Sequence, residues 1–83
     1  MNALVAERSD EIKQLVCRVL EVDAEQVSET DLFIDDLEAD SMKMIELLAH
    51  LEIEFDVEID EDELARLVNL RGVYEVLSAA LDA

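Results

Sequence analysis

The sequence predicts an all-α protein: a four-helix bundle of three main helices and a short third helix, with a long first loop. Two observations support this fold class. Apolar residues recur at helical spacing in separate stretches of the chain, and aromatic residues are scarce (4%) while proline is absent, so the core must be built from aliphatic side chains. With 83 residues there is room for one core, and we expect a single domain over residues 1–83.

The first helix is predicted between Ser9 and Leu20. Its apolar residues recur three or four positions apart, which is the stripe of an amphipathic helix: Ile12, Leu15, Val16, Val19 and Leu20. Leu4 and Val5 lie on the same stripe, so the helix can begin earlier, although Arg8 then interrupts the stripe.

From Glu21 to Asp40 the helical period is lost. The segment is rich in residues that favour turns and caps, and its apolar residues are irregularly spaced: Val22, Val27, Leu32, Phe33 and Leu37. We expect a long connection that these apolar side chains pin to the core. A loop of this length is unusual in so small a domain and indicates a functional role.

A second helix is predicted from Ser41 to Phe55, with Asp40 as its N-cap. Five apolar side chains share one sector of this helix, which is therefore expected to be buried: Met44, Leu47, Leu48, Leu51 and Phe55. The opposite side carries the residues expected to face solvent: Met42, Lys43, Glu46, Ala49, His50 and Ile53.

Two further helices complete the bundle. Acidic residues from Asp60 to Glu63 begin a short third helix that reaches Leu67, as the helix dipole favours. The segment from Asn69 to Gly72 interrupts the pattern, and we expect the final helix to follow it. One face of that helix is apolar: Val73, Val76, Leu77 and Ala80.

The formal net charge of −17 limits the kinds of partner that the protein can bind. Such a charge repels nucleic acids and anionic membrane surfaces, so neither is an expected partner. It favours docking onto proteins with basic patches, although acidity that serves only solubility explains the composition equally well. No apolar run approaches the roughly 20 residues of a membrane span, and the N-terminal residues lack a signal-peptide pattern. A cytoplasmic monomer without membrane insertion is the expectation.

Conventional catalytic groups do not form a site. His50 follows Ser41 by nine positions and faces the other side of the same helix, out of hydrogen-bond reach. The single cysteine, Cys17, lacks a cationic neighbourhood and is interpreted as a packing residue. The acidic run after Asp60 lacks the glycine and distal glutamate of a calcium loop. We therefore expect no catalytic residue, no metal site and no enzyme activity.

Ser41 stands where a polar loop becomes a helix. The first N–H groups of a helix are unpaired and favour a phosphate, so a hydroxyl at this position is well placed to carry a phosphodiester. The alternative is that Ser41 merely starts the helix. Met42 and Ile53 favour the first interpretation, because apolar residues on a solvated face beside acidic ones suggest a docking surface for a basic, partly apolar partner.

The run from Asp36 to Met42, followed by Ile45–Leu47 and Leu51–Ile59, resembles the centre of an acyl carrier protein of the stand-alone, type II kind. The Asp-Ser-Met motif is short, but the Glu-x-Glu-Phe-x-x-x-Ile segment follows it at the distance found in that family. The resemblance extends over nearly the whole chain. It includes the first helix, the connection, and the segment that leads into the last helix.

The resemblance implies that Ser41 receives a 4'-phosphopantetheine arm from coenzyme A through a phosphopantetheinyl transferase, and that the arm carries acyl groups as thioesters. Implied partners are acyltransferases, ketosynthases and other acyl-processing enzymes with basic docking patches. Four residues match positions commonly used for partner docking in the family: Asp40, Met42, Glu46 and Glu52. Ala49 and Ile53, on the outward face of the same helix, complete the expected docking surface. Candidates to line an acyl cavity are Leu48, Leu51, Phe55, Ile59 and Val73.

Four positions depart from the family pattern. Glu38 stands where glycine is usual, Lys43 and Ile53 replace common acids, and Asp60 replaces a common proline. The altered charge favours a dedicated carrier for polyketide or other specialised biosynthesis over the fatty acid carrier. An aminoacyl or peptidyl carrier and a non-covalent, calcium-responsive acidic adaptor are the competing hypotheses.

Overall fold

The computed structural model describes residues 2–82, which form four α-helices and two 3-10 helices without a strand. The elements are α1 (Ala3–Glu7), α2 (Ser9–Leu20), η1 (Ala24–Gln26), α3 (Ser41–Phe55), η2 (Glu61–Arg66) and α4 (Leu70–Asp82). This confirms the predicted all-α class, the long first loop and the short third helix. Among the helices of this described part, none is long and apolar enough to cross a membrane.

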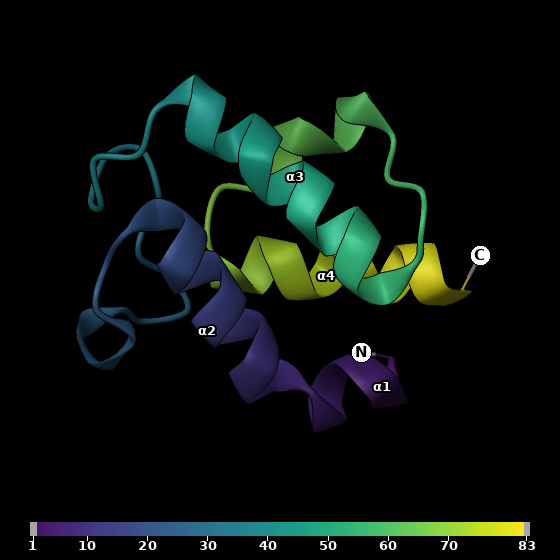
Figure 1. Cartoon of the computed structure of the whole chain (residues 1–83). Coiled ribbons are helices and arrows are strands. Elements are labelled where there is room, and N and C mark those ends of the chain that lie inside the picture. Colours follow the sequence, from purple (N-terminus) through teal and green to yellow (C-terminus); the bar gives the residue numbers. More distant parts are fainter. Residues whose placement is uncertain (1, 83) are drawn as a thin grey trace.

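One hydrophobic core joins α1, α2, α3 and α4. In Figure 1, α3 crosses in front of α4, and α2 lies beside both. All five residues predicted for the buried sector of α3 are buried. Each fully buried aliphatic side chain contributes roughly 1.5–3 kcal/mol, so the core is the main stabilising element. The largest fully buried side chains come from every part of the chain: Val5, Ile12, Phe33, Leu47, Leu51, Leu67, Leu70 and Leu77.

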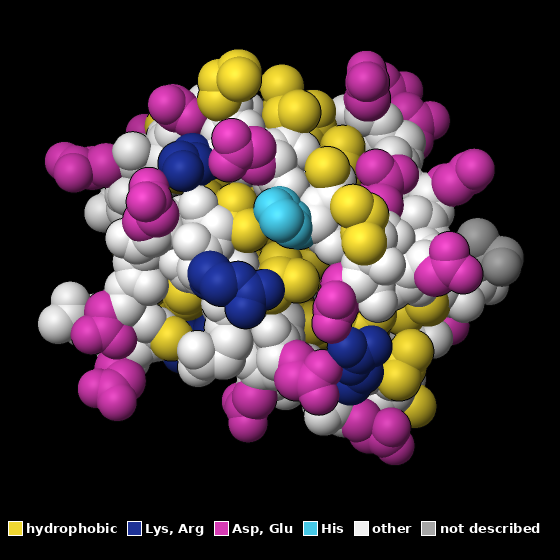
Figure 2. Space-filling model, viewed as in Figure 1, with side chains coloured by type: hydrophobic (Ala, Val, Ile, Leu, Met, Phe, Trp, Pro, Cys, Tyr) yellow, Lys and Arg dark blue, Asp and Glu magenta, His cyan; other side chains and the backbone are white. Residues whose placement is uncertain are grey.

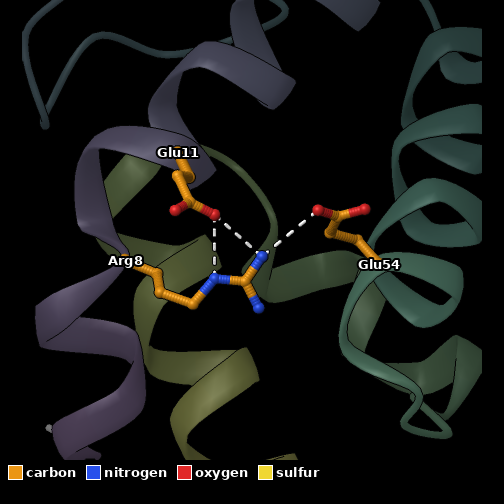
Figure 3. A network of polar contacts seen from close by, with 3 residues as sticks. All are labelled: Arg8, Glu11 and Glu54. Carbon is orange, nitrogen blue, oxygen red and sulfur yellow. Dashed lines mark hydrogen bonds and ion pairs between the residues drawn. The ribbon is translucent and has the colours of Figure 1, made fainter.

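A helix does precede Ser9, and it ends at Arg8, as the sequence suggested. Of the two residues expected on the apolar stripe there, Val5 is buried, whereas Leu4 is 41% exposed. The Arg8 guanidinium lies 4.4 Å from the centroid of the Phe55 ring and forms ion pairs with Glu11 at 2.8 Å and Glu54 at 3.2 Å (Figure 3). These contacts connect the start of α2 to the end of α3. Because they are partly exposed, each is worth about 1 kcal/mol or less.

The two ends of the described chain are held together. The Asn2 backbone N–H donates to Ser78 Oγ at 3.1 Å, and its side-chain amide donates to Asp82 Oδ1 at 2.6 Å. Asn2 Oδ1 also accepts from the Leu4 N–H and thereby caps α1. In Figure 1 both ends lie on one side of the molecule, opposite the long loop.

Long-range hydrogen bonds attach the long loop to the rest of the molecule. The Phe33 N–H donates to the Val68 carbonyl at 2.8 Å, and the Arg71 N–H donates to the Glu29 carbonyl at 3.1 Å. Phe33 is fully buried, as expected of an anchor. The same expectation is wrong for Leu32, which is 38% exposed. The Leu32 N–H donates to Asp36 Oδ2, and the Leu32 carbonyl accepts from the Asp36 N–H. The resulting turn directs the Leu32 side chain outward.

The final helix begins earlier than predicted, at Leu70 rather than after Gly72. Asn69 acts as its cap, because its Oδ1 accepts from the Gly72 N–H at 2.8 Å. Gly72 is buried, and a Cβ added there would overlap the Arg66 carbonyl oxygen. The residues expected to break the helix therefore start it, and the glycine allows α4 to approach η2 closely.

Candidate functional site

Ser41 is the first residue of α3, and its side chain is exposed. Asp40 has an extended backbone, and its Oδ1 accepts from the Lys43 N–H at 3.0 Å, which confirms the predicted N-cap. Within residues 2–82, the backbone N–H groups of Ser41 and Met42 have no hydrogen-bond acceptor. The positive end of the helix and these two donors favour a phosphate attached at this position.

Among residues 2–82, no side chain forms a hydrogen bond with the Ser41 hydroxyl that could activate it. His50 lies on the exposed side of the same helix and makes no hydrogen bond with Ser41. Cys17 is buried, and this burial raises the pKa of its thiol, which disfavours the reactive thiolate. No group of histidine, cysteine and acidic side chains among residues 2–82 could hold a metal ion. The described part of the chain therefore supplies no base or metal ion that would activate the Ser41 hydroxyl.

The outward face of α3 combines apolar and acidic side chains. The six residues predicted for docking from the sequence are called the docking strip: Asp40, Met42, Glu46, Ala49, Glu52 and Ile53. Met42 and Ile53 are 65% and 80% exposed, which is high for apolar residues, and Figure 2 shows hydrophobic side chains along α3 among acidic ones. Sequence reasoning missed Ile45, which is 54% exposed. Its position one turn after Met42 was the available signal.

Two acids of the docking strip are already engaged within the protein. Asp40 caps α3, and Glu52 Oε2 accepts from the Ile59 N–H at 3.0 Å. Glu52 is accordingly half-buried, and it fixes the segment that follows α3. Glu46 is exposed, and its carboxylate lies 3.9 Å from the Lys43 Nζ.

Lys43 is directed toward α2. Its Nζ lies 3.2 Å from Glu21 Oε2 at the end of that helix, and the hydrogen bond with Glu21 raises the pKa of the lysine. Lys43 is half-buried, whereas the strip residues beside it are exposed. The positive charge that the sequence placed on the outward face therefore lies between the helices and is paired there.

The five residues expected to line an acyl cavity lie in the closed core. Each of them is at most 8% exposed: Leu48, Leu51, Phe55, Ile59 and Val73. An apolar hollow of about 340 Å³ opens nearby, where the long loop, α3 and η2 meet. Its lining consists of Leu32, Ile34, Asp35, Met44, Leu64, Leu67 and Val68. Sequence reasoning missed this hollow because three separate segments build it.

Comparison with known proteins identifies the family. Residues 10–77 match the family described as a phosphopantetheine attachment site. The chain is 52% identical over 79 residues to polyketide-8 synthase acyl carrier protein 1 of Streptomyces avermitilis, and the match covers 95% of this chain and 94% of that relative. The chain belongs to the acyl carrier protein family. Its cofactor is accordingly a covalently attached 4'-phosphopantetheine, and it is a carrier rather than a catalyst.

Solved structures agree with this assignment. The structure of the ishigamide ketosynthase/chain length factor contains a chain with a TM-score of 0.76 and 36% identity to this carrier, covering 93% of this chain and 97% of that one. The acyl carrier protein from Enterococcus faecalis has a TM-score of 0.69 and 25% identity, covering 86% and 95%. The carrier thus shares its helical fold with other acyl carrier proteins, and it presents acyl groups to the enzymes that process them.

Proposed function

We propose that Ser41 carries the phosphopantetheine arm and that the carrier serves a polyketide synthase. The observation that supports the attachment residue is the exposed hydroxyl at the first position of α3, with free N–H groups beside it. The pathway is supported by 52% identity to a carrier named for a polyketide synthase.

Intact mass spectrometry tests the attachment residue. The apo protein, incubated with coenzyme A and a broad-specificity phosphopantetheinyl transferase, gains one arm. A Ser41→Ala variant gains none, whereas Ser28→Ala, which removes an exposed loop hydroxyl, is modified like the wild type. An arm on the Ser41→Ala variant would show that the attachment residue lies elsewhere.

The cargo distinguishes the polyketide proposal from its competitors. The protein isolated from its native host is expected to carry extended acyl chains that retain several keto, hydroxyl or alkene groups. Saturated acyl chains would indicate fatty acid synthesis, and an aminoacyl group would indicate a peptidyl carrier. Loading assays with malonyl and aminoacyl donors distinguish an acyl carrier from an aminoacyl or peptidyl carrier in vitro.

We propose that the docking strip contacts the phosphopantetheinyl transferase, acyltransferase and ketosynthase through their basic patches. Exposed Met42 and Ile53 supply apolar contact, and Glu46 supplies charge. Glu46→Lys is expected to raise the KM for the carrier in the transferase reaction, and this effect shrinks at high salt. Glu25→Lys makes the same charge change outside α3, and an equal effect of both variants would refute a local contact.

We infer that an acyl chain enters through the hollow beside Met44 and then separates α3 from η2 to reach the five predicted cavity residues. The hollow is apolar, and Met44 joins it to the first turn of the helix that Ser41 begins. Methyl NMR of acetyl-loaded and octanoyl-loaded protein tests the route. The longer chain is expected to shift Leu64 and Leu67 together with Leu48 and Leu51. Shifts confined to exposed residues would refute an internal path.

A further inference from the structure

An ion pair beside the docking strip includes a residue outside α3. Glu21 ends α2 with a left-handed backbone conformation (φ 59°), and its side chain is exposed. Its Oε2 lies 3.2 Å from the Lys43 Nζ. The pair therefore connects the end of α2 to the first turn of α3, although these residues are far apart in the sequence.

The Lys43 ammonium lies between two carboxylates. One belongs to Glu21, outside the docking strip, and the other belongs to Glu46, inside it, at 3.9 Å. Attraction between charges weakens with distance, and only the Glu21 contact is within hydrogen-bond range. The ammonium therefore makes its closer contact with Glu21 and keeps only a longer ion pair with Glu46.

Glu46 differs from the other two acids of the docking strip. Asp40 accepts a backbone hydrogen bond as the N-cap, and Glu52 accepts one from the Ile59 N–H. The Glu46 carboxylate accepts no hydrogen bond from any described residue, and its one ion-pair contact is the longer one to Lys43. Its carboxylate is thus the strip acid most available to a cation of a partner, provided that Lys43 stays with Glu21.

We propose that Glu21 is a specificity-determining residue for partner docking, because it holds Lys43 against α2 and leaves Glu46 to a lysine or arginine of the partner enzyme. This rests on the proposed function, in which the docking strip contacts partners. Without Glu21, Lys43 pairs with Glu46 instead. That change neutralises the available acid and places an ammonium group in front of the partner's own cation.

Steady-state kinetics of the phosphopantetheinyl transferase at low salt test the proposal. Glu21→Ala is compared with Glu25→Ala, which removes the same charge from an exposed position on η1. Relative to Glu25→Ala, the Glu21→Ala variant is expected to raise the KM for the carrier about two- to fivefold without changing kcat, the range that one exposed ion pair supports. Equal KM values for the two variants would mean that only net charge matters, and would refute the role of Glu21.

The double variant Glu21→Ala/Lys43→Gln separates electrostatics from helix positioning. With the competing ammonium removed, Glu46 is free again, and the KM is expected to return to the wild-type value or below. A KM that stays as high as in Glu21→Ala would show that Glu21 acts by fixing the helices, and would overturn the proposal. A wild-type protein that accepts no arm at all would instead refute the proposed function.

Discussion

Replacing Glu38 by glycine is expected to stabilise the carrier. Glu38 adopts a left-handed backbone conformation (φ 59°). It lies in the loop between the buried residues Phe33 and Ala39, two positions before the N-cap of α3. The Ala39 N–H donates to the Phe33 carbonyl at 2.8 Å, which holds this backbone in place. The Glu38 side chain is exposed and makes no hydrogen bond or ion pair with any described residue, so its removal costs no contact.

The size of the expected gain in stability follows from the backbone conformation of Glu38. A left-handed backbone conformation destabilises the folded state by about 1–2 kcal/mol when the residue has a Cβ, whereas glycine adopts it freely. Glycine loses about 0.5–1 kcal/mol more entropy on folding. The net gain is about 0.5–1 kcal/mol, and for a domain of this size a gain of 1 kcal/mol raises Tm by about 4–8 °C.

Thermal unfolding followed by circular dichroism measures this gain. Glu38→Ala is the matched control, because it removes the same negative charge but keeps the Cβ. Glu38→Gly should melt several degrees above Glu38→Ala. Equal melting temperatures would show that relief of charge repulsion, and not the backbone conformation, accounts for any stabilisation.

Three further outcomes are expected. Gly72→Ala should lower stability by about 1–2 kcal/mol in chemical denaturation, since the added Cβ overlaps the Arg66 carbonyl and the gain in helix propensity offsets only part of that strain; an unchanged midpoint would contradict the close approach of α4 to η2. Tm should rise gradually with NaCl or MgCl2 as the net charge of −17 is screened, and a Tm independent of salt would argue against self-repulsion. Burial raises the pKa of the Cys17 thiol and of the Tyr74 phenol, so the unfolded chain loses these protons first. The free energy of unfolding should therefore fall as pH rises above about 8.5, with a shallower decline in Cys17→Ala, and equal slopes for both proteins would contradict this origin.

Local signals in the sequence were sufficient to predict α3 and the exposed serine at its start. The cap at Asp40 and the apolar period that follows depend on neighbours within one or two turns, so the predicted range Ser41–Phe55 agrees with the structure. The same holds for the helix before Ser9 and its end at Arg8. In these segments the hydrogen bonds that define the element lie within the element itself.

The irregular segments were harder to predict, because their conformation depends on contacts with distant residues. No period distinguishes Leu32 from Phe33, and the bond between Phe33 and Val68 decides which side chain turns inward. Asn69 and Gly72 are typical of a break when the sequence is considered alone. They begin α4 because the Asn69 side chain caps the helix at the Gly72 N–H, and because Gly72, without a Cβ, leaves room for the Arg66 carbonyl.

The sequence by itself determined the helical class, the bounds of α3 and the exposed serine at its start, because each of these depends on residues close together in the chain. Only the tertiary structure decided where the charge of Lys43 is directed, and where the apolar hollow opens. The physical reason is that an ion pair between α2 and α3, and a surface built from three segments, exist only after distant parts of the chain have packed together.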